Sequence, residues 1–211
     1  MARKRNKPLP VTVDGNNIKA YLYFHKSLEG TPEGYDETYA DMCVNGITRY
    51  WSEAGFNVEI IRLKESLKVP HVKVLPAKLT RTSYVMSPAW RWIWGFFKNF
   101  HPEAMMLNWS PSNPGNIHLN LRFFKDKNRF ERVSAHEFGH VLGLGDAYGA
   151  HYRFFYEAPG TEDYMMNHNR KVSPEEALMV KRAHETGKMQ YFPMKFSARK
   201  YASGLRKKRK T

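Results

Sequence analysis

Two histidines and a glutamate in the middle of the chain constrain its fold more than any other feature. His136 and His140 are four residues apart with Glu137 between them, and Gly143 and Asp146 follow three and six residues after the second histidine. Side chains four residues apart share one face of an α-helix, so this spacing requires a helix that brings both imidazoles together. A glycine can end such a helix and turn the following aspartate back towards the histidines.

These side chains are typical of a metal site. Imidazole nitrogen and carboxylate oxygen both bind Zn²⁺ well, at ~2.0 to 2.2 Å. We therefore predict that His136, His140 and Asp146 bind one catalytic zinc ion. Three protein ligands leave a fourth position open, which is typical of a catalytic rather than a structural zinc. Glu137 is expected to face the water at that position and to act as general base and acid.

The third metal ligand has alternatives in the sequence. His151 lies five residues beyond Asp146 and can replace it if the loop between them folds differently. Glu157 and Glu162 are weaker candidates, because a carboxylate so late in the chain would leave Gly143 without a role. The spacing favours Asp146.

The same residues resemble the metzincin peptidases, whose extended motif is H-E-x-x-H-x-x-G-x-x-H/D, and the final aspartate is similar to the snapalysin-like subgroup. The resemblance implies a zinc-dependent endopeptidase with a methionine-bearing turn beneath the metal. Segment 163–168 is similar to that turn, with Met166 the better match and Met165 the next. Some members carry a tyrosine two residues after this methionine as an extra ligand or oxyanion stabiliser. Here that position is His168.

A substrate-binding strand is also implied by the resemblance, because family members pair an extended peptide with an edge strand above the cleft. This strand maps to about residues 105–111, with Leu107, Asn108 and Trp109 in it.

Hydrophobic periodicity predicts a mixed α/β fold of the α+β class. The resemblance makes it zincin-like, with a twisted, mostly parallel sheet, an antiparallel edge strand and two main helices, together with the active-site helix, the methionine turn and a C-terminal helix. Ser173 and Glu176 form a capping box that opens the last helix. The strands are expected at about 18–24, 56–60, 72–75, 105–109 and 117–123, and the helices at about 35–55, 129–143 and from 173 onwards.

The formal net charge of +14 comes mostly from the two ends of the chain. Residues 1–13 carry four basic side chains and residues 195–211 carry eight, and neither stretch contains an acid. We expect basic tails, the C-terminal one disordered, around a nearly neutral catalytic domain at 14–194. Its upper lobe is expected at about 14–145 and its lower lobe at about 146–194.

Other function classes stay open on the sequence. The basic tails suit weak contact with polyanions or anionic membranes, and they also suit a nucleic-acid-binding protein or a metal-dependent nuclease. A zinc ion without catalysis would make the chain a binding module. Glu137 favours amide hydrolysis, so the expected partner is a polypeptide substrate, and the protein is expected to be a monomer.

The compartment is not set by the sequence. Cys43 is the only cysteine and is expected in the core, and no secretory leader or membrane-spanning stretch is visible. This pattern fits a cytoplasmic protein, or a secreted one that is exported without a leader or cut from a precursor. The aromatic segment 90–100 is interpreted either as an insertion packed over the sheet or as an exposed patch.

Overall fold

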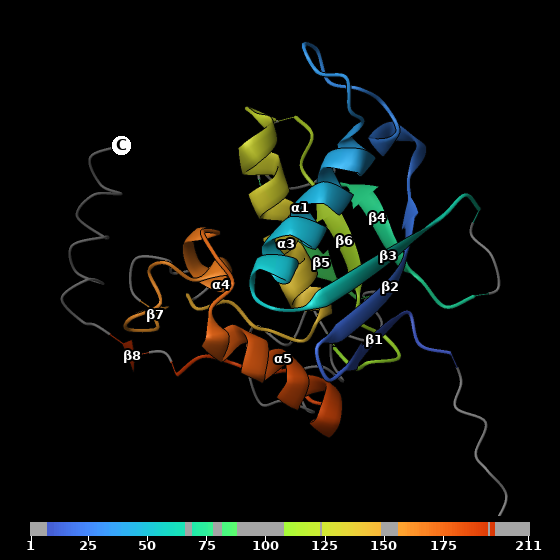
Figure 1. Ribbon diagram of the computed structural model, residues 1–211. Helices are drawn as coiled ribbons and strands as arrows, with labels where there is room; N and C mark the ends of the chain where they lie inside the picture. The colour runs from blue at the N-terminus through green and yellow to red at the C-terminus, as the bar shows by residue number, and fades with distance from the viewer. Residues whose placement is uncertain are drawn as a thin grey trace, which may run out of the picture.

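A computed structural model describes residues 8–65, 69–77, 82–87, 108–122, 124–148, 156–193 and 195–196. These residues form a six-stranded sheet with helices packed against it and a separate two-stranded pair (Figure 1). The strands are β1 (Val11–Asp14), β2 (Asn17–Phe24), β3 (Asn57–Leu63), β4 (Val72–Pro76), β5 (Tyr84–Met86), β6 (Asn116–Leu119), β7 (Tyr156–Glu157) and β8 (Lys195–Phe196). The helices are η1 (Lys26–Leu28), α1 (Tyr39–Glu53), α3 (Lys127–Val141), α4 (Met165–His168) and α5 (Pro174–Thr186).

Strand β2 is the centre of the sheet. It pairs with β3 in parallel along one edge, and along its other edge it pairs first with antiparallel β1 and then with parallel β4. β4 continues to parallel β6, and β6 to antiparallel β5, which ends the order. The predicted mixed α/β architecture is therefore confirmed. Strands β2, β3, β4 and β6 are parallel, and two strands, β1 and β5, are antiparallel, where the prediction had one.

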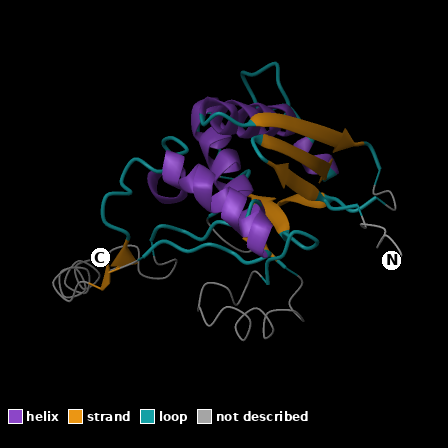
Figure 2. Cartoon of the chain, turned by 60° about the horizontal axis from the view of Figure 1, so that its bottom comes forward, coloured by secondary structure: helices purple, strands orange, loops and turns teal. Residues whose placement is uncertain are grey.

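One face of this sheet is covered by α1 and α3 (Figure 2). Alternate residues of β2 from Ile18 to Phe24 are buried, whereas those between them are half-exposed, so the main core lies under the helices. α1 and α3 approach each other very closely at Gly46, where a Cβ atom would lie 2.6 Å from the Cα of Glu131. Cys43 is buried in the same core, as predicted, and burial raises the pKa of its thiol to about 12.

The three predicted helices are present, and their ends differ from the predicted ones by up to four residues. Local capping groups determine where they start. Thr38 caps α1 and Ser173 caps α5, each in a capping box with the acid three residues later. Asp126 caps α3, and its Oδ1 accepts a hydrogen bond of 2.7 Å from the backbone N–H of Arg129. Among the described residues, no helix combines the length and apolarity that crossing a bilayer requires.

The sheet departs from the prediction at its ends. Residues 11–13, which we placed in the N-terminal tail, form β1 together with Asp14, because Val11 is fully buried and Gly15 at φ +56° closes a tight turn into β2. β6 stops at Leu119, four residues earlier than expected, because its partner β4 ends at Pro76. Residues 195–196, expected in the C-terminal tail, pair with β7 as β8. The remaining tail residues 1–7 and 197–211 and the aromatic segment 90–100 lie outside the described residues.

Candidate metal centre

The C-terminal end of α3 turns the chain back on itself at Gly143. The backbone N–H of Gly143 donates to the carbonyl of His140, and that of Leu144 donates to the carbonyl of Gly139, which is the Schellman pattern. Gly143 has φ +97°, and a Cβ there would lie 2.7 Å from the Trp109 ring, so both its conformation and its space require glycine. The turn leads directly to Asp146, as the sequence predicts.

The three candidate ligands converge on one point. Asp146 Oδ1 lies 3.2 Å from His136 Nε2 and 3.5 Å from His140 Nε2, and the three ligand atoms lie within 4.8 Å of one another. In a tetrahedral site with bonds of ~2.0 to 2.2 Å, ligand atoms are about 3.4 Å apart. The distances of 3.2 and 3.5 Å from Asp146 Oδ1 to the two imidazoles lie on either side of that value. These residues can therefore hold a divalent metal ion.

Backbone carbonyls orient both imidazoles for this role. His136 Nδ1 lies 2.8 Å from the carbonyl oxygen of Met165, and His140 Nδ1 lies 2.8 Å from that of Leu144. A carbonyl oxygen only accepts, so each Nδ1 must carry a hydrogen, and in the neutral imidazole Nε2 is then the atom that offers a lone pair to a metal ion. Carbonyl partners of this kind fix the orientation of metal-binding histidines.

The protein groups around the site favour positive charge there. Burial alone would lower the pKa of His136, but the hydrogen bond and charge of Asp146 outweigh burial and raise that pKa to about 9. Burial lowers the pKa of His140, which keeps its Nε2 in the neutral, metal-binding form. A divalent cation would satisfy the same Asp146 charge that otherwise holds a proton on His136.

Glu137 lies on α3 beside the three ligands. It is buried, and burial raises the pKa of its carboxyl to about 8, with His136 opposing and Asp146 adding to the shift. Its Oε2 atom is buried without a hydrogen-bond partner among the described residues. A carboxyl oxygen left unpaired in such a place costs folding energy, which indicates a role towards something that binds in the cleft.

The one-turn helix α4 forms a floor under α3. A Cβ on Gly139 would collide with the Sδ of Met166, so the buried Met166 side chain packs directly against the site helix. The carboxylate of Glu176, at the start of α5, accepts hydrogen bonds from the backbone N–H of Met166 at 2.7 Å and of Ser173 at 2.6 Å. Because Met165 contributes the carbonyl that orients His136, Glu176 ties α5 to the metal site through this turn.

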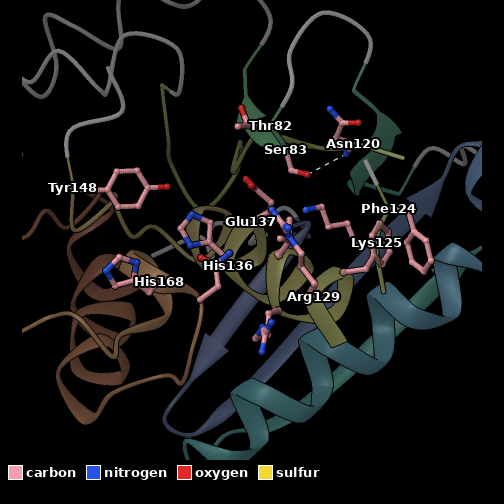
Figure 3. A pocket seen from close by; sticks show the side chains of 14 residues that line it. Thr82, Ser83, Asn120, Phe124, Lys125, Arg129, His136, Glu137, Tyr148 and His168 are labelled. Atoms are coloured by element: carbon pink, nitrogen blue, oxygen red, sulfur yellow. Dashed lines mark hydrogen bonds between the residues drawn. The ribbon is translucent and has the colours of Figure 1, made fainter. Parts of the chain in front are cut away.

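A cleft of about 440 Å³ opens above His136 and Glu137. His168 is exposed and lines the cleft, but it is not in the group of converging ligand atoms. Figure 3 shows Tyr148 and His168 on one side of Glu137. Tyr148 was not predicted, and its only sequence signal is its place two residues after Asp146; its ring lies nearly parallel to that of His136, with centroids 6.4 Å apart.

Of the three alternative third ligands, the structure describes the side chain of Glu162. His151 lies outside the described residues, and so does the side chain of Glu157. Glu162 is exposed and is not in the converging group. Among the described residues, Asp146 is the acid that meets both histidines.

The predicted substrate strand requires a correction at its described residues. Asn108 and Trp109 are not in a strand, and Leu107 lies outside the described residues. Trp109 is fully buried and its indole N–H donates to the carbonyl of Val141 at 2.9 Å, so it closes the end of α3 instead of facing a peptide. The antiparallel edge strand is β5, and Thr82 and Ser83, just before it, line the cleft.

Three basic residues on the wall of the cleft were also not predicted as residues of the site. Lys125, Arg129 and Arg132 line it from α3 and the residue before its cap. In the sequence these residues belong to a nearly neutral domain, so the net charge gives no sign of them. A signal was present in the helical spacing, since residues 129, 132 and 136 fall on one face of α3.

Comparisons with known proteins give little beyond this geometry. No protein-family model matches the chain, and no curated protein matches its sequence. Among solved structures, the chain is similar to that of myroilysin at 15% sequence identity, with a TM-score of 0.29, over 92% of this chain and 77% of that one. A TM-score this low does not establish a common fold, and the function proposed below rests on the site alone.

Proposed function

We propose that the chain is a zinc-dependent endopeptidase. The observation that carries this proposal is the convergence of His136, His140 and Asp146 on one point, with the unpaired carboxyl oxygen of Glu137 beside them in a cleft. Two neutral imidazoles and a carboxylate suit zinc better than magnesium or calcium, which prefer all-oxygen ligands.

A bound Zn²⁺ would polarise the scissile carbonyl and lower the pKa of a water molecule towards ~7. Glu137 then takes a proton from the attacking water as the new bond to the carbonyl carbon forms. It returns that proton to the leaving nitrogen as the carbon–nitrogen bond breaks, so the carboxyl group is regenerated. The pKa of Glu137, raised by burial, favours the first of these steps, because a raised pKa makes the carboxylate a stronger base towards the proton of the water.

The other residues of the site position these groups. The carbonyls of Met165 and Leu144 hold the imidazoles, and Met166 supports α3 from below. His168 and Tyr148 line the cleft where a developing negative charge on the substrate oxygen would need a donor. We assign them as candidates for that contact.

The test uses the full-length protein loaded with zinc. We expect one zinc ion per chain, loss of that ion in Asp146→Ala, and cleavage of internal bonds in a peptide library. In Glu137→Ala the zinc content should stay the same while kcat/KM falls about 100- to 10,000-fold. Glu175→Ala, which removes an exposed acid on α5, is the matched control and should keep full activity. Full zinc content without peptide cleavage by the wild type would instead mean a binding module, and unchanged cleavage by Glu137→Ala would refute the mechanism.

A further inference from the structure

One wall of the cleft is strongly basic. Lys125 and Arg129 are exposed there and Arg132 is half-buried, and none of the three makes an ion pair within the described part of the chain. Among the described residues that line the cleft, Glu137 is the only acid. In Figure 3, Lys125 and Arg129 lie on the opposite side of Glu137 from Tyr148. The wall therefore presents positive charge to whatever the cleft binds.

The charge on α3 is segregated between two faces. Glu131 is buried and pairs with Arg49 of α1 at 3.1 Å and with Lys127 at 3.9 Å, on the side that packs against α1. The nearest acid to the cationic wall in sequence is Asp126, and its Oδ1 is used to cap the helix. The acids near this wall thus interact with other groups of the protein. The cations of the cleft are therefore available to a bound ligand.

The distance from the reacting centre is set by the helix. α3 rises 1.5 Å per residue, so Arg132 and Arg129 begin about 7 Å and about 12 Å from Glu137 along its axis. An extended peptide advances about 3.3 Å per residue. An extended peptide that runs along α3 would therefore meet these two cations about two to four residues from the bond that is cut.

An extended peptide fits this cleft better than a nucleic acid. β5 pairs through one edge with β6, and no described strand pairs with its other edge, so its main chain can add a substrate strand. Phe124 and Val133 add apolar surface to the cationic wall. Guanidinium groups bind carboxylates with two parallel hydrogen bonds, which gives selectivity as well as attraction.

We infer that Arg129 and Arg132 form a subsite that selects peptides with an aspartate or glutamate two to four residues from the scissile bond, on one side of it, and that Lys125 adds positive charge to the same wall. This subsite rests on the proposed peptidase function and gives it a substrate class. Its signature is a preference that depends on charge, weakens with salt and appears at one side of the cleavage site.

The experiment profiles zinc-loaded full-length protein on a peptide library that is varied at four positions on each side of the cleaved bond. The wild type should prefer Asp or Glu over Asn or Gln. Arg129→Gln/Arg132→Gln should lose about 10- to 100-fold in kcat/KM on the acidic peptides, mainly through KM, and about twofold or less on their amide analogues. Arg182→Gln/Lys188→Gln removes two exposed charges from α5 and the turn after it, and it should leave both values unchanged.

Charge reversal gives a gain that a merely damaged protein cannot show. Arg129→Glu/Arg132→Glu should turn the preference towards Lys and Arg at the same positions. Peptide cleavage by the wild type without any acidic preference would refute the subsite and leave the peptidase intact. Equal losses on acidic and amide peptides would also refute it.

A binding measurement separates the two proposals. Zinc-loaded Glu137→Gln is titrated with a fluorescent Asp-containing peptide, its Asn analogue and a single-stranded oligonucleotide of equal charge. Tighter binding of the Asp peptide supports the subsite even if the wild type cleaves no peptide, in which case only the peptidase proposal fails. Tighter binding of the oligonucleotide overturns the acidic-peptide subsite.

Discussion

Replacing Glu176 with alanine should destabilise the protein far more than its position outside the cleft suggests. Its carboxylate is fully buried and accepts hydrogen bonds from the backbone N–H groups of Ser173 at 2.6 Å and Met166 at 2.7 Å, with a longer one from Met165 at 3.4 Å. Each buried donor that loses its acceptor costs about 1–3 kcal/mol. Counting the two short bonds gives about 2–6 kcal/mol, and burial, which raises the pKa of Glu176 and disfavours its charge, reduces this to about 3 kcal/mol.

For a chain of this size, 1 kcal/mol lowers Tm by about 2–4 °C, so Glu176→Ala should lower it by about 6–12 °C. Glu175→Ala is the control, because Glu175 is its exposed neighbour and, within the described part of the chain, accepts a hydrogen bond from the Tyr164 hydroxyl alone; it should cost less than about 1 kcal/mol. The assay is thermal unfolding followed by circular dichroism, with and without zinc. Because Met165 orients His136, zinc affinity should also fall about 10- to 100-fold in the Glu176 variant. Equal Tm values for the two variants would refute this account of the buried carboxylate.

Three further predictions concern the interior of the site and the helix behind it. Gly139→Ala should lower both Tm and zinc affinity, because the new methyl group meets Met166, and adding Met166→Ala should restore part of each loss; no restoration would mean that the two do not touch. Glu137→Gln should make the zinc-free protein more stable by about 2–4 kcal/mol near pH 8. The folded-state pKa of this carboxyl is about 8, so its ionisation opposes folding increasingly above pH 4.5. Denaturant titration at pH 5 and pH 8 tests this, and an equal difference in unfolding free energy between variant and wild type at both pH values would contradict it. Burial lowers the pKa of His184 to about 4 against an ordinary 6.5, so its stabilising effect is complete above pH 6.5 and about 3 kcal/mol is lost as pH falls to 4; His184→Phe should flatten that slope, and an unchanged slope would exclude His184 as its source.

Elements with strong local signals were predictable from the sequence. The capping box of Ser173 and Glu176 predicts helix α5, and four alternating apolar residues predict β2. The missed strands β1 and β5 have four and three residues, and each is a strand only because a longer neighbour pairs with it. Such pairing depends on contacts between distant parts of the chain, which periodicity does not report.

The candidate site divides in the same way. The spacing of His136, His140 and Asp146 within one helix and one turn is enough to predict from the sequence that their side chains converge. The role of Glu176 could not, because its helix-capping pattern gives no sign that the same carboxylate also binds the backbone of α4. The cationic wall could not be predicted from the net charge of the whole domain. That sum combines basic and acidic residues that the fold places on different faces.

The close approach of α1 and α3 at Gly46 has a consequence for how the cleft can open. With the backbone of one helix touching the other, neither can slide or roll without a collision, so the histidines are anchored to the sheet through a rigid contact. Any widening that admits substrate must therefore come from the segment beyond Gly143, which carries Asp146 and α4. A bound metal ion would then join α3, which α1 holds in place, to the segment beyond Gly143, which can move. Loss of the ion should increase the mobility of that segment alone.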